Sequence, residues 1–78
     1  MNGAVEGFNK DLLYGQITAK GMTVTEFAKK IGMNPSTFFR KTSANGSKFS
    51  VGEVKAIVNT LGISNEDACN IFLGKNLH

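Results

Sequence analysis

The chain has 78 residues, 41% of them hydrophobic, and a net charge of +3, which together predict one small domain with a compact core. The single cysteine, Cys69, excludes an internal disulfide, and no apolar run approaches the roughly 20 residues that a membrane-spanning helix needs. We therefore expect a cytoplasmic protein that makes no membrane contact and is stabilised by the packing of its own helices.

Five helices are expected in chain order, because side chains that cap helix starts recur before apolar residues at helical spacing. The expected helices cover residues 10–20, 23–32, 34–43, 50–62 and 64–74. Their N-terminal caps are, in the same order, Asn9, Thr23, Asn34, Ser50 and Ser64. Four of the helices end at Gly21, Gly32, Gly62 and Gly74. No strand pattern competes, so we predict an all-α bundle over residues 9–74, with a flexible N-terminal arm (1–8) and a tail (75–78).

The second and third predicted helices meet at a short turn, and their sequences fit two helices that cross steeply. Ala28 is small enough to allow close approach of the two backbones, and Gly32 tolerates the positive φ that the turn requires. The inward apolar positions are Phe27, Ile31, Met33 and Phe38. This pattern predicts a helix-turn-helix.

The third predicted helix carries a polar strip on the side away from the core. At about 100° per residue, the positions opposite Phe38 are Ser36, Arg40 and Ser43, with Thr37 and Phe39 beside them. Arginine can form two hydrogen bonds to guanine, hydroxyls can bond base edges or phosphates, and an apolar group can contact the thymine methyl. For Phe39 the alternative is packing against the edge of the fourth helix.

Positive charge is concentrated in the middle of the chain. Residues 27–52 include five lysines and arginines and no acid, which gives +5, whereas the rest carries four lysines and six acids, which gives −2. This distribution indicates a polyanionic partner on one face, and a solvated lysine surface is the alternative reading.

At these residues the chain resembles a known family. The stretch TVTEFAKKIGMNPSTFFRK is similar to the helix-turn-helix of the Cro and phage-repressor family (XRE type, lambda-repressor-like), and the similarity continues through SVGEVKAIVNTLGIS. It covers about Leu12 to Leu73 and is closest to short phage-encoded regulators. The resemblance implies a five-helix lambda-repressor-like DNA-binding domain that acts in transcription regulation as a repressor. It also implies a homodimer on a near-palindromic double-stranded DNA operator.

The resemblance further implies which residues contact DNA. The candidates for base contacts are Asn34, Ser36, Thr37, Phe39, Arg40 and Ser43. The candidates for phosphate contacts are Thr23, Thr25, Lys41, Asn45 and Lys48. The chain departs from the family at Val24, where the family often has glutamine, and at Lys41, where an apolar residue is usual.

The fifth predicted helix has more apolar surface than one core-facing side needs, which predicts self-association as a homodimer. The candidate interface residues are Cys69, Phe72 and Leu73. For Phe72 the alternative is packing beneath the first helix. We expect Cys69 to be a small, half-buried apolar residue.

The chain offers no set of residues for an enzyme. One cysteine and a terminal histidine, His78, cannot form a metal site or a nucleophilic triad, and no glycine motif for binding phosphate precedes a helix. We therefore expect a sequence-specific DNA-binding regulator of the repressor or Cro type, without metal, cofactor or small-molecule ligand. The second hypothesis is a protein-interaction module on the same fold, such as an antirepressor or an antitoxin partner, which the apolar fifth helix and the modest total charge favour.

Overall fold

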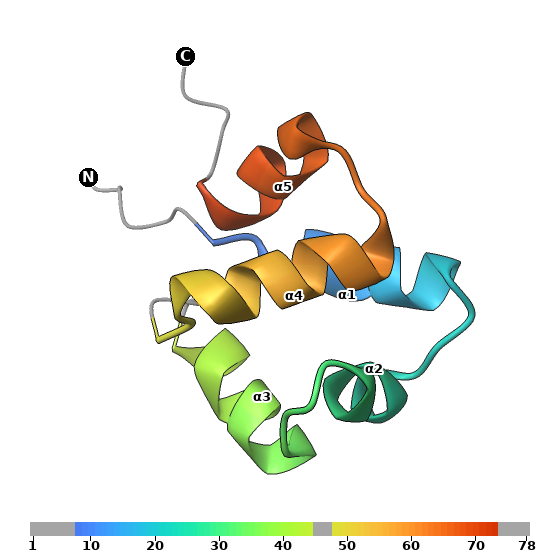
Figure 1. The fold of residues 1–78 in the computed structure, drawn as a ribbon, viewed down its shortest axis with the longest axis vertical. Helices are drawn as coiled ribbons and strands as arrows, with labels where there is room; N and C mark the ends of the chain where they lie inside the picture. The colour runs from blue at the N-terminus through green and yellow to red at the C-terminus, as the bar shows by residue number, and fades with distance from the viewer. Residues whose placement is uncertain (1–7, 45–47, 74–78) are drawn as a thin grey trace.

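The computed structural model describes residues 8–44 and 48–73, which form five α-helices joined by short turns (Figure 1). The helices are α1 (Lys10–Ala19), α2 (Val24–Lys30), α3 (Pro35–Ser43), α4 (Val51–Leu61) and α5 (Asn65–Phe72). No strand occurs in these two described ranges, so the all-α, five-helix prediction is confirmed. Gly74, expected to end the last helix, and the predicted tail lie outside the described residues.

Each helix begins where a side-chain oxygen accepts a hydrogen bond from a backbone N–H of the first turn. The capping residues are Asn9, Thr23, Asn34, Ser50 and Ser64, as the sequence predicts. At α2 the Thr23 hydroxyl accepts from the Glu26 N–H at 3.0 Å, and the Glu26 carboxylate accepts from the Thr23 N–H at 2.9 Å. Ser50 and Glu53 form the same reciprocal pair at α4. The helix starts are therefore determined by residues two or three positions apart.

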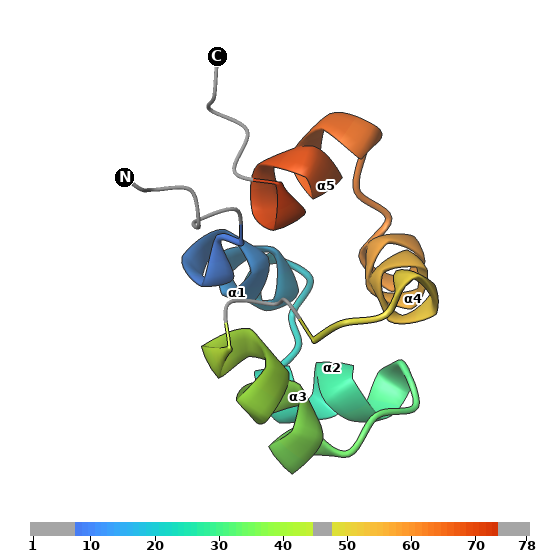
Figure 2. The same cartoon turned by 90° about the vertical axis from the view of Figure 1, so that its left-hand side faces the viewer.

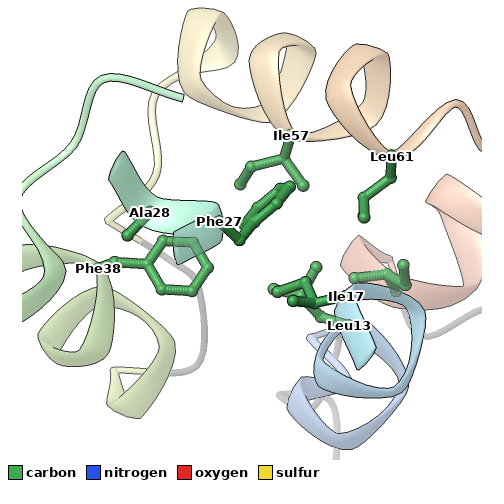
Figure 3. Packing of buried hydrophobic residues seen from close by; sticks show 8 residues of the cluster. Leu13, Ile17, Phe27, Ala28, Phe38, Ile57 and Leu61 are labelled. Carbon is green, nitrogen blue, oxygen red and sulfur yellow. The ribbon is translucent and has the colours of Figure 1, made fainter. Parts of the chain in front are cut away.

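A single cluster of apolar side chains fills the space between the helices (Figure 3). Its members, each 0 or 1% exposed, are Leu13, Ile17, Phe27, Ala28, Phe38, Ile57, Leu61 and Ile71. Burying a large apolar side chain stabilises the fold by about 1.5–3 kcal/mol. All five helices contribute to the cluster, so each is held in place mainly by this burial.

The arrangement of the helices separates two ends of the molecule. In both views α2 and α3 lie at one end and α5 lies at the other, with α1 and α4 between them (Figure 1, Figure 2). Within the described residues, α3 and α5 therefore lie at opposite ends of the bundle.

Aromatic rings join the beginning of the described chain to α5. The ring centroid of Phe8 lies 5.7 Å from that of Phe72 and 6.2 Å from that of Phe49. The backbone N–H of Asn9 donates to the carbonyl oxygen of Ile71 at 2.6 Å. The structure therefore places Phe8 in the packed domain and not in the N-terminal arm, because its ring packs against α5 and against the segment before α4. Residues 1–7 lie outside the described part.

Candidate nucleic-acid interface

A tight turn joins α2 to α3. Gly32 has a φ of 78°, in the left-handed region that glycine adopts without strain, as its predicted role requires. The Met33 N–H donates to the Ala28 carbonyl oxygen at 2.9 Å and closes the turn. The Asn34 side chain then accepts from the Ser36 N–H at 2.8 Å and starts α3. The chain thus changes direction within a few residues.

The contact between α2 and α3 is apolar. The rings of Phe27 and Phe38 meet edge to face with their centroids 5.9 Å apart, and both side chains are fully buried (Figure 3). Ala28 is also fully buried, on the helix turn before the break. Ile31 and Met33 are partly buried and pack against the same core, so the predicted inward positions are confirmed.

The opposite side of α3 faces solvent. Ser36, Arg40 and Ser43 are exposed, and we call these three residues the outer strip of α3. Thr37 is half-buried beside the strip, and Phe39 is 42% exposed on its other side. The predicted exposure of the strip is confirmed, whereas its contact with DNA stays a prediction.

The polar groups of this surface keep hydrogen-bonding capacity. Arg40 Nη2 donates to Thr37 Oγ1 at 3.5 Å, which is too long for a strong hydrogen bond and leaves the guanidinium donors available for a bidentate contact. Asn34 uses its side-chain oxygen as the cap of α3, so its amide NH₂ is the group that can bond a base. No acidic residue lies in α3.

The candidates for phosphate contacts differ in how available they are. Thr25 and Lys48 are exposed. The Thr23 oxygen accepts the capping bond, which leaves its hydroxyl hydrogen to donate. Asn45 lies outside the described residues.

Lys41 has a partner within the chain that the sequence pattern does not predict. Its Nζ donates to both carboxylate oxygens of Glu53, at 2.8 and 2.9 Å, and both side chains are partly buried. Two hydrogen bonds lower the pKa of Glu53. The one from Lys41 has the larger effect, and the one from the Ser50 N–H has the next largest. The departure of position 41 from the apolar residue usual in the resembled family is the one sequence signal that could have indicated this pair.

A second unpredicted contact joins α3 to α1. The Tyr14 hydroxyl and Thr42 Oγ1 lie 2.8 Å apart, and Thr42 is the one buried polar residue in the described part of the chain. Thr42 also donates to the Phe39 carbonyl oxygen at 3.0 Å. Nothing in the local pattern pairs residues on α1 and α3 that lie so far apart in the chain.

At the other end of the molecule an apolar groove of about 380 Å³ lies between α4 and α5. It is lined by Phe49, Val51, Val54, Lys55, Ala68, Cys69, Phe72 and Leu73. Leu73 is 66% exposed, and Phe72 is half-buried with its ring against Phe8 and Phe49. The expectation that Cys69 is half-buried is wrong: Cys69 is exposed, because it lies on the side of α5 that lines this groove and not on the side that carries the buried Ile71.

In the described ranges, 8–44 and 48–73, no three histidine, cysteine, aspartate or glutamate side chains are grouped so that they could hold a metal ion. No helix of the same ranges is long and apolar enough to cross a membrane; the longest, α4, has 11 residues.

Comparisons of the chain with protein-family models, with curated proteins and with solved structures found no match. The resemblance to the Cro and phage-repressor family is therefore carried by the residues of this chain alone. Those residues are the two capping pairs, the small Ala28, the glycine of the turn and the inward apolar positions Phe27, Ile31, Met33 and Phe38, together with the stretch that forms α4.

Proposed function

We propose that α2 and α3 form a helix-turn-helix and that the protein is a sequence-specific, double-stranded DNA-binding transcription regulator of the phage repressor or Cro type. One observation carries the proposal: α3 exposes Ser36, Arg40 and Ser43 on the side opposite the buried Phe38. A helix that reads the major groove needs hydrogen-bonding side chains, such as arginine and serine, on its outer face.

In this proposal, affinity and specificity come from different residues. Lys48 and the hydroxyls of Thr23 and Thr25 contact phosphates, which orients the protein without reading sequence. Arg40 reads a guanine, Ser36 bonds a neighbouring base edge or phosphate, and Phe39 offers an apolar surface to a thymine methyl. Lys41 contributes less than the sequence indicates, because its ammonium group is already bound to Glu53.

The proposal includes a homodimer formed through α5. Leu73 and Val51 are 66% and 74% exposed and line the same groove between α4 and α5, and an exposed apolar patch of this kind marks an interaction surface. Two copies joined there carry two α3 helices, and contact with successive major grooves on one side of a duplex requires a spacing of about 34 Å. The operator is then a near-palindrome.

The same groove favours a second candidate function, a protein-interaction module that binds another regulator. An apolar groove of about 380 Å³ can accept side chains of a partner helix as well as those of a second copy. In that case the basic residues of α3 are solvated surface and carry no sequence readout.

Salt dependence of DNA binding separates the two candidates. For the DNA-binding function, anisotropy of a short fluorescent duplex should show an affinity that falls steeply with salt, with a log–log slope of about −0.9 for each phosphate contacted. A matched measurement with a neutral fluorescent polymer controls for nonspecific adsorption. Absent or salt-independent duplex binding would contradict the DNA-binding proposal and favour the interaction module.

A further inference from the structure

Two polar contacts hold α3 against the rest of the molecule from opposite sides. On one side Thr42 is bound to Tyr14 of α1, with 2.8 Å between the hydroxyl oxygens. On the other side Lys41 is bound to Glu53 of α4, with both carboxylate oxygens within 2.9 Å of Nζ. The two residues are adjacent in sequence but reach different helices.

The direction of the first contact follows from counting hydrogens. Thr42 donates its only hydroxyl hydrogen to the Phe39 carbonyl oxygen, at 3.0 Å, because a carbonyl can only accept. The Tyr14 hydroxyl must therefore be the donor to Thr42 Oγ1. A directed chain of hydrogen bonds thus runs from α1 through Thr42 to the backbone of the residue that precedes Arg40.

In the second contact, a further hydrogen bond holds the Glu53 carboxylate in place. Glu53 Oε1 accepts from Lys41 Nζ at 2.8 Å and also from the Ser50 N–H at 2.9 Å. The carboxylate that binds α3 is therefore fixed to the first turn of α4 by its capping bond. It is not free to follow a movement of α3.

When α3 is viewed along its axis, the two contacts lie on either side of the buried Phe38. At about 100° per residue, Lys41 lies about 60° to one side of Phe38 and Thr42 about 40° to the other. Ser36 and Arg40 each lie within about 20° of the direction opposite Phe38. The contacts therefore oppose rotation of the outer strip in both senses.

We infer that Tyr14, Thr42, Lys41 and Glu53 are positioning residues, which fix the rotation of α3 so that Ser36 and Arg40 meet the base edges at a set angle. The inference rests on the proposed DNA-binding function. The buried Phe38, packed against Phe27 and Phe49, restrains α3 on one side, and the two hydrogen-bonded contacts add directional restraints on either side of it. A rotation of about 20° would displace an atom about 6 Å from the helix axis by about 2 Å. That displacement exceeds the range of about 0.5 Å within which a hydrogen bond forms well.

The first test compares Thr42→Val, which keeps the shape and removes the hydroxyl, with Thr42→Ser, which keeps the hydroxyl. The probes are a duplex selected by the wild-type protein from random DNA and an unrelated duplex of equal length. We expect Thr42→Val to lower affinity for the selected duplex about fivefold, with the unrelated duplex within about twofold of wild type, and Thr42→Ser to restore it. Equal losses on both duplexes would overturn the inference, since they indicate general destabilisation.

The second test uses Glu53→Gln, which keeps an acceptor for the Ser50 N–H but releases the charge of Lys41. Affinity for the selected duplex should fall, while affinity for the unrelated duplex should stay the same or rise, because the freed lysine can bind phosphate. A parallel loss on both duplexes would contradict positioning. Circular dichroism at the assay temperature verifies that each variant is folded.

A double-mutant cycle then connects the contacts to Arg40. If Thr42 acts by aiming Arg40, Thr42→Val should have less than about half its effect on the selected duplex in the Arg40→Ala background. Full additivity would overturn the inference and leave the proposed function intact. A wild-type protein that selects no sequence at all would remove the proposed function, and this inference with it.

Discussion

Glu53 is the residue at which pH should report on the contact between α3 and α4. Its pKa lies below the ordinary value of 4.5, chiefly because of the hydrogen bond from Lys41, so folding favours the charged form. The stabilisation is therefore present above pH 4.5 and is lost as the pH falls through the lowered folded-state pKa.

The corresponding prediction concerns Glu53→Gln. At neutral pH it should reduce the free energy of unfolding by about 0.2–1 kcal/mol, the range for a partly exposed ion pair, and the difference from wild type should vanish in strong acid. Thermal melts followed by circular dichroism, from neutral pH to strong acid, measure this difference in the free energy of unfolding. Glu66→Gln, also in the first turn of a helix, is the matched control. A difference that persists unchanged in strong acid would show that the lost contact is not ionic.

Lys48 tests the distinction between phosphate contacts and base contacts. It is exposed just before α4, where we propose that it contacts a phosphate. Lys48→Ala should weaken binding to selected and unrelated duplexes by a similar factor and reduce the salt slope by about 1. Lys29→Ala, at an exposed lysine of α2, should leave the affinity for both duplexes and the salt slope unchanged. A loss confined to the selected duplex would reassign Lys48 to base readout.

At the scale of elements, the close approach of α2 to its neighbours depends on Ala28. The residue is fully buried, so a larger side chain has no space without displacing a helix. Ala28→Leu should destabilise the protein by about 1–3 kcal/mol even without DNA, which thermal or denaturant unfolding would detect. Ala19→Leu, at an exposed position of α1, controls for helix propensity. Equal unfolding free energies for wild type and Ala28→Leu would exclude tight packing at this site.

At the scale of the whole molecule, the groove between α4 and α5 should determine the oligomeric state. Leu73 is exposed at this groove, so Leu73→Glu places a charge in the proposed dimer contact. Sedimentation should show a concentration-dependent dimer for wild type, at least with DNA bound, and a monomer for the variant. Leu12→Glu changes an exposed leucine of α1 and should leave the dimer intact. A wild-type monomer bound singly to a palindromic duplex would exclude this dimer.

The sequence predicts the parts of this fold that depend on near neighbours. Five caps, the turn glycine at 32 and the inward and outward sides of α3 all follow from residues a few positions apart. The contacts Tyr14–Thr42 and Lys41–Glu53 join residues 28 and 12 positions apart, and they depend on how the helices pack. The exposure of Cys69 depends in turn on the rotation of α5 against the bundle, and apolar residues on several of its sides left that rotation undetermined.

The most direct test of sequence-specific reading by α3 is selection of bound sites from random double-stranded DNA, performed with wild type and Arg40→Ala in parallel. Wild type should enrich two similar half-sites in inverted orientation with centres about 10 base pairs apart. Arg40→Ala should enrich the same half-site with the preference lost at one base pair. No enriched sequence for wild type, or the same preference at every position for the variant, would contradict the claim that the outer strip of α3 reads DNA.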